Sequence, residues 1–282
     1  MRRVWVVLLL IACIATAVGS ARGLGRIVEV DQGADELLYL PNGKFLKVAS
    51  LGQAPVLADL IYIWAIQFYS DYARDDRFRY VRHVFSDVIA ELDPHYIDAY
   101  WLGAMILIVE DGDLEGGLAL LDQGFAANPD EWILPYLAAW ECWLADQPDR
   151  AVEYFELAAA VPQAPTNVRR MRAAMVARSG ALETSLGLWQ EILDDPGTDP
   201  TSVKIAERKI RGLTVRLHQR DLRAAIERFR IDNSRYPQSL AELARAGYIR
   251  FIPHHPDGAD YDYDPTSGKI SSPRGRILGD SG

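Results

Sequence analysis

Residues 131–162 read EWILPYLAAWECWLADQPDRAVEYFELAAAVP, and this stretch decides the fold. It predicts two helices in a hairpin, with Ala139 as a small residue in the first helix. Ala151, Phe155 and Ala158 follow at the offsets where the second helix packs on the first. The small residues allow a close approach, and the phenylalanine fills the remaining space. One such hairpin cannot bury its own apolar face, so we expect several copies to stack.

Prolines recur at a nearly constant interval around this hairpin. Spacings of 35, 33 and 34 residues separate Pro94, Pro129, Pro162 and Pro196. A period near 34 residues that closes with proline indicates helix–turn–helix repeats. The adjacent copies keep the same order of small residues, turn and bulky residues. Their matching positions are Gly103-Ala104, Asp111-Gly112-Asp113, Gly117, Leu121 and Gly124 before the hairpin, and Ala173, Ser179-Gly180, Ser185, Trp189 and Ile192 after it.

These repeats resemble the tetratricopeptide repeat (TPR) family over about residues 54–196. A degenerate first copy has apolar stripes at helical spacing over residues 56–72 and 80–92. The resemblance implies a mainly α solenoid of helical hairpins and says little about chemistry. We therefore expect the solenoid and its capping helix to occupy residues 54–220.

Aromatic and arginine side chains gather on one face when the repeats are placed in register. Stacked first helices present an extended concave surface, and aromatic residues with arginine are favoured at binding hot spots. Arginine can also hold a carboxylate with two hydrogen bonds. We therefore predict a groove for a protein or peptide partner, formed by Trp101, Tyr136, Trp140, Trp143, Arg170 and Arg178. In the alternative interpretation, Trp140 and Trp143 only wedge neighbouring helices together.

The N-terminus has the pattern of an export signal. Arg2 and Arg3 precede an uncharged run over residues 4–21. Residues 1–22 therefore read as an uncleaved membrane anchor, a cleaved signal peptide or, at Cys13 in the sequence LIAC, a lipoprotein signal. Each alternative exports the remainder, which predicts the periplasmic side of a bacterial cell envelope. Residues 23–53 read as a linker and a segment that caps the solenoid; in the alternative interpretation, that segment is a docking segment.

Composition argues against several classes of function. The net charge of −9 is unlike that of a general nucleic-acid binder. Cys13 and Cys142 are the two cysteines, and neither a disulfide nor a metal-ligand spacing follows from them. Motifs for a catalytic nucleophile, a phosphate loop or a zinc site are missing, so we predict no enzyme and no cofactor. The imidazole–carboxylate cluster at His254, His255 and Asp257 lacks the third group of a catalytic set.

A basic helix is predicted after Pro200. Thr201-Ser202 can cap it, and Gly212 can split it into a capping helix and a second helix. Its cations form either a solvated face or a contact for phosphate or an acidic partner. The cations are Lys204, Arg208, Lys209, Arg211, Arg216, Arg220, Arg223, Arg228 and Arg230.

The C-terminal residues 221–282 change in character. Ser239 with Glu242 reads as a capping box, and Tyr261, Tyr263 and Ile270 alternate with polar residues as in a β-hairpin. The run FRIDNSRYPQSLAEL, followed by GYI, PDG and YDY, resembles the soluble part of type II secretion pseudopilins over about residues 221–272. A pseudopilin carries its apolar assembly helix directly before this module, whereas a solenoid precedes it here.

The module extends the prediction of function. The pseudopilin resemblance implies a link to a secretion or type IV pilus-like apparatus for a non-enzymatic scaffold. In the alternative, the protein is a structural subunit whose α+β module inserts into a larger envelope assembly. The carboxylates of Asp257, Asp260, Asp262 and Asp264 are of the type that calcium prefers, although their spacing matches no calcium loop.

Overall fold

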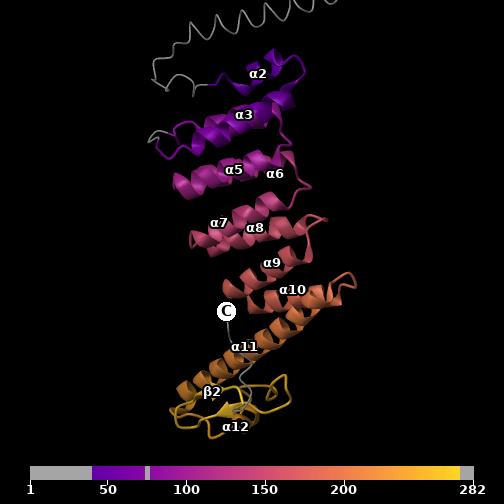
Figure 1. The fold of residues 1–282 in the computed structure, drawn as a ribbon. Coiled ribbons are helices and arrows are strands. Elements are labelled where there is room, and N and C mark those ends of the chain that lie inside the picture. The colour runs from indigo at the N-terminus through magenta and orange to yellow at the C-terminus, as the bar shows by residue number, and fades with distance from the viewer. Residues whose placement is uncertain (1–39, 74–76, 274–282) are drawn as a thin grey trace, which may run out of the picture. The chain divides into compact units, whose positions relative to one another are not determined.

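The computed structural model describes residues 40–73 and 77–273. The described chain is mainly helical with one two-stranded sheet (Figure 1), as the sequence predicted at this level. The predicted anchor, signal and lipidation site within residues 1–22 lie outside the described residues. None of the described helices combines the length and the hydrophobicity that a membrane span requires. The chain divides after Asp93 into two compact units.

The described part of the first unit, residues 40–73 and 77–93, contains four helical elements. They are α2 (Gly43–Ala49), α3 (Ala54–Tyr69), η1 (His83–Ile89) and α4 (Ala90–Leu92). Asn42 begins α2 because its side-chain oxygen accepts a hydrogen bond from the Lys44 amide at 2.8 Å. Gly43 is required at this point, since a Cβ atom there would lie 2.5 Å from the Asp87 carbonyl oxygen. The backbone of α2 therefore packs directly on η1.

The second unit begins with helices that pack in chain order (Figure 1). Within it, α7 packs on α8, α8 on α9, α9 on α10, and α10 on the long helix that follows. A π-helical segment, η2, extends α5, the first helix of this unit. The Asp111 amide there donates to the Ile106 carbonyl, five residues earlier. The elements are α5 (Ile97–Met105), η2 (Ile106–Glu110), α6 (Leu114–Ala127), α7 (Ile133–Leu144), α8 (Pro148–Ala160), α9 (Thr166–Arg178) and α10 (Leu182–Asp194).

Small residues bring these helices together. A Cβ atom on Gly124 of α6 would lie 2.6 Å from Cγ of Tyr100 in α5 and 2.8 Å from Cδ1 of Leu134 in α7. Ala139 of α7 and Phe155 of α8 are fully buried in one apolar cluster with Met175 of α9. The predicted small position Ala139 and bulky position Phe155 thus meet between α7 and α8, and Met175, which the pattern did not predict, joins them from α9.

A side-chain amide ties one proline turn to the next helix pair. Nδ2 of Asn128 donates to the carbonyl oxygens of Pro94 at 2.8 Å and Gly124 at 2.9 Å. Oδ1 of the same residue lies 2.7 Å from Nδ1 of His95. Asn128 and Pro94 are 34 residues apart, which falls within the 33–35-residue spacing of the prolines in the sequence.

The predicted basic helix is one continuous element, α11 (Pro200–Asn233). Asp199 is its cap, since its carboxylate accepts from the amides of Thr201 at 3.0 Å and Ser202 at 2.9 Å. The prediction that Thr201-Ser202 caps the helix was therefore wrong by two residues. The break proposed at Gly212 is absent, because a glycine with helical backbone angles costs only about 1 kcal/mol relative to alanine.

The C-terminal module packs on the second half of α11. It contains α12 (Leu240–Arg245) and the antiparallel strands β1 (Asp262–Tyr263) and β2 (Ile270–Ser271), so the hairpin prediction is confirmed. The capping box is only partly present. Ser239 precedes α12 but makes no side-chain cap bond, and Glu242 accepts from the Gln238 amide at 2.6 Å instead. The buried core of the module is Leu222, Ala225, Ile226, Phe229, Leu240, Leu243, Tyr261 and Ile270.

Candidate functional site

Three of the predicted groove residues form an aromatic row along α7. Tyr136, Trp140 and Trp143 are spaced four and three residues apart, so helical geometry places them on one face. The rings of Tyr136 and Trp140 lie 6.3 Å apart. Both also contact the buried ring of Phe155 in α8, at 5.8 and 5.9 Å in edge-to-face arrangements. The three side chains are half-buried and pack on the buried cluster of Ala139, Phe155 and Met175.

Arg178 extends this row onto α9, the first helix of the following helix pair. It is exposed at the end of α9, and its guanidinium carbon lies 5.1 Å from the centroid of the Trp143 ring. Met171 and Met175 of α9 pack against the same aromatic cluster. We call Tyr136, Trp140, Trp143 and Arg178 the α7–α9 surface. It offers flat apolar area next to a guanidinium group that can bind an anion or a carboxylate.

The structure places the other two predicted residues elsewhere. Trp101 lies on α5 with 44% of its surface exposed, and no described ring contact joins it to the α7–α9 surface. Arg170 lies near Asp199, at the start of α11. The hydrogen bond from Ser202 lowers the pKa of Asp199, and the positive charge of Arg170 contributes to that lowering.

The wedge interpretation describes Trp140 better than it describes Trp143. Trp140 packs edge-to-face on Phe155 and so helps to fill the space between α7 and α8. Trp143 instead contacts the exposed Arg178 side chain at the surface end of the row. Both tryptophans pack on the buried cluster, and Trp143 in addition carries the contact with the charged Arg178 side chain.

Glu141 was missed by sequence reasoning. It precedes Cys142 on α7, and only 9% of its surface is exposed. Burial raises the pKa of its carboxyl above the ordinary value. Within the described residues its side chain has no hydrogen-bond or ion-pair partner. Helical spacing could have indicated this burial, because Glu141 follows Leu134 and Ala138 on the face of α7 opposite to the aromatic row.

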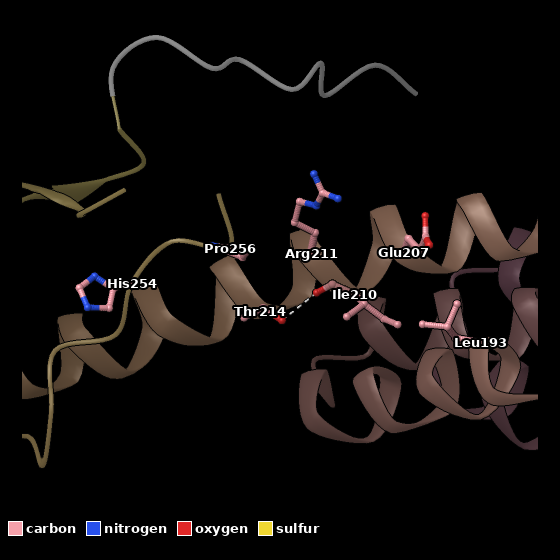
Figure 2. A pocket seen from close by; sticks show the side chains of 7 residues that line it. All are labelled: Leu193, Glu207, Ile210, Arg211, Thr214, His254 and Pro256. Carbon is pink, nitrogen blue, oxygen red and sulfur yellow. Dashed lines mark hydrogen bonds between the residues drawn. The ribbon is translucent and has the colours of Figure 1, made fainter. Parts of the chain in front are cut away.

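A groove of about 430 Å³ lies between the end of α10, the middle of α11 and the loop at residues 254–256. Figure 2 shows the side chains that line it. The Thr214 hydroxyl donates to the Ile210 carbonyl at 2.9 Å, and His254 contacts Asp260 at 2.9 Å. Neither group is paired with the other as a nucleophile with its base would be. The lining residues are Leu193, Glu207, Ile210, Arg211, Thr214, His254 and Pro256.

Next to this groove, the structure joins the predicted imidazole–carboxylate cluster to α11. Nδ1 of His255 lies 3.5 Å from Asp257, and Arg211 of α11 contacts the other oxygen of that carboxylate at 3.6 Å. The Tyr261 hydroxyl lies 3.0 Å from Nδ1 of His218. Burial lowers the pKa of His218 and raises the pKa of Tyr261. These contacts fasten the loop to the long helix.

The candidate calcium carboxylates have other partners. Asp257 contacts Arg211, and Asp260 contacts His254. Asp264 accepts from the hydroxyl groups of Thr266 and Ser267 and from the Thr266 amide, and these bonds lower its pKa to about 2. Across residues 40–73 and 77–273, no group of three His, Cys, Asp or Glu side chains is placed to hold a metal ion.

Comparison with known proteins adds no family to these observations. The chain matches no protein-family model, and it matches no curated protein sequence.

Proposed function

We propose that this chain is a non-enzymatic scaffold of the bacterial cell envelope, which binds a protein or peptide partner through a TPR-like solenoid. In this proposal the solenoid occupies residues 54–220, and residues 1–22 export it as an anchor or a cleaved signal. The partner belongs to a secretion or type IV pilus-like apparatus. Support for the repeat architecture comes from the second unit, where consecutive helices pack in order and Asn128 links turns 34 residues apart.

The observation that carries the binding role is the Arg178–Trp143 pair. It places a guanidinium over an indole on two consecutive first helices, beside two further aromatic rings. Large rigid rings with arginine supply contact area and a directed charge, which is the composition of energetic hot spots. A peptide that brings an apolar side chain and a carboxylate would satisfy both parts of the α7–α9 surface.

The test compares partner recovery from solubilised envelope membranes. Tagged full-length protein with Arg178→Glu should recover the partner at least about tenfold less well than the natural sequence, because a hot-spot arginine is reversed. Arg245→Glu on α12 is the matched control and should recover it normally. Circular dichroism establishes that both variants are folded. Equal recovery by the two variants would exclude the α7–α9 surface as the binding site.

The exposed apolar residues of the C-terminal module favour a second candidate, a structural subunit. The module has its own buried core, yet Ile231 on α11 and Phe251 in the following loop are 66% and 68% exposed. Exposed large apolar side chains are typical of surfaces that contact another protein. Under this proposal, Ile231→Asp with Phe251→Ser should reduce the size of the solubilised complex on a density gradient, and Arg178→Glu should leave it unchanged. The opposite pattern would support the scaffold and exclude the structural subunit.

A further inference from the structure

The charge of this protein is strongly divided between its elements. Residues 94–160 carry thirteen carboxylates and one arginine, a net charge of −12. Helix α11 carries nine lysine and arginine residues and four carboxylates, a net charge of +5. The chain as a whole is acidic, so the cations of α11 are concentrated against the general trend.

Three cations lie in a row along α11. Lys209, Arg216 and Arg223 are seven residues apart, which places them on one face at intervals of about 10.5 Å. All three are exposed. Three other arginines of the helix form ion pairs: Arg211 with Asp257, Arg220 with Glu183 and Arg230 with Glu227. In the described parts of the chain, no carboxylate forms an ion pair with the three residues of this basic row.

An acidic row lies on α8, and its two outer members are separated by one interval of the basic row. Asp149, Glu153 and Glu156 are exposed at positions i, i+4 and i+7, so they share one face. Glu156 lies 3.8 Å from Arg172, a weak contact with half of the glutamate side chain exposed. Asp149 and Glu153 form no ion pair within residues 40–73 and 77–273. The seven-residue step from Asp149 to Glu156 equals the step in the basic row.

We propose that the basic row of α11 binds the acidic row of α8 on a second copy of this chain. Within one copy the two rows are not paired, although both are exposed. Complementary charges guide encounter and set the register of a contact, and the Asp149–Glu156 step can face one step of the basic row. The two rows are different surfaces, so the contact is head-to-tail and leads to a ring or an open chain of copies. An anionic lipid surface fits less well, since the basic row has no large apolar side chain between its cations.

Sedimentation velocity of the full-length chain in a non-ionic, density-matched detergent tests this association. The natural sequence should self-associate at about 50 mM NaCl, and the association should weaken at least about tenfold at about 500 mM because salt screens exposed charges. Arg216→Glu with Arg223→Glu should abolish it, whereas Arg216→Lys with Arg223→Lys should retain it.

A complementary charge reversal makes the test specific for the two rows. The double variant Glu153→Lys, Glu156→Lys should be monomeric by itself, as the Arg216→Glu, Arg223→Glu variant should be. Mixing this variant with the Arg216→Glu, Arg223→Glu variant restores opposite charges across the contact and should restore association. Three results would overturn the proposal: a natural sequence that stays monomeric at low salt, variants that fail to complement, and binding of Arg216 and Arg223 to phosphatidylglycerol vesicles without self-association.

Discussion

The guanidinium carbon of Arg178 lies 5.1 Å from the centroid of the Trp143 ring. This contact joins α9 to α7, two helices that are not consecutive in the chain. It depends on the register of the helix pairs, because a change of one position on either helix would move one partner to another face. The pair is therefore a marker for the packing of this region as well as the centre of the α7–α9 surface.

The Arg178–Trp143 pair should be energetically coupled. We expect a double-mutant cycle with Arg178→Met and Trp143→Leu to give a coupling free energy of about 0.5–1 kcal/mol, as for exposed cation–π pairs. Urea unfolding of the two single variants and the double variant measures it. A cycle of Arg245→Met with Trp143→Leu is the control and should show additive effects. Additivity in the first cycle would mean that the two side chains do not meet.

Two glycines should respond in opposite directions to replacement by alanine. At Gly124 the added Cβ would lie 2.6 Å from Tyr100, so we expect a loss of about 1–3 kcal/mol in the free energy of unfolding. Gly187 in α10 has no atom within 4 Å of the added Cβ. Gly187→Ala should therefore stabilise the protein by up to about 1 kcal/mol through helix propensity. Thermal unfolding of both variants checks the pair, and a harmless Gly124→Ala would refute the close contact between α5, α6 and α7.

Glu141→Gln should remove a pH dependence of stability. Burial raises the pKa of Glu141 in the folded protein, so the folded state holds its proton at a pH where the unfolded state has lost it. Stability from this group is therefore greatest at low pH and decreases as pH rises from the unfolded pKa through the folded one. The glutamine variant should lose this decrease and gain stability at neutral pH.

Urea unfolding at pH 4 and pH 7 measures the effect of Glu141→Gln. Glu153→Gln on the exposed face of α8 is the control, and its stability should follow that of the natural sequence. A natural sequence that is more stable relative to Glu141→Gln at pH 7 than at pH 4 would contradict the account of this buried carboxylate.

Local sequence patterns predicted the helix pairs and the β-hairpin, because each pattern reflects the burial of apolar side chains at the spacing of its element. Ala151, Phe155 and Ala158 mark burial at helical spacing, and Tyr261 and Tyr263 pack on the module core at alternating spacing. The helix start at residue 200 was harder to predict, because Asp199, Thr201 and Ser202 are all residue types that cap helices. Oδ1 of Asp199 accepts from the amides of both Thr201 and Ser202, and Oδ2 accepts from the Ser202 hydroxyl, so Asp199 forms the observed cap.

The contacts of the candidate site depend on distances that a repeat register does not supply. Register predicted that Trp143 and Arg178 share a surface, and they contact each other. It grouped Arg170 and Trp101 with them, although Arg170 lies near Asp199 and Trp101 is exposed on another helix. The π-helical segment η2 was also missed, because one extra residue in a turn leaves no clear compositional pattern.

Photo-crosslinking in cells tests the proposed binding surface most directly. A benzoylphenylalanine at Leu144, which is 73% exposed beside Trp143 and Trp140 on α7, should form an adduct with a single envelope protein. The same probe at Gln190, on the exposed face of α10, should not. The Leu144 adduct should disappear when Arg178→Glu is added. An adduct at Gln190 alone, or a Leu144 adduct that survives Arg178→Glu, would contradict binding at the α7–α9 surface.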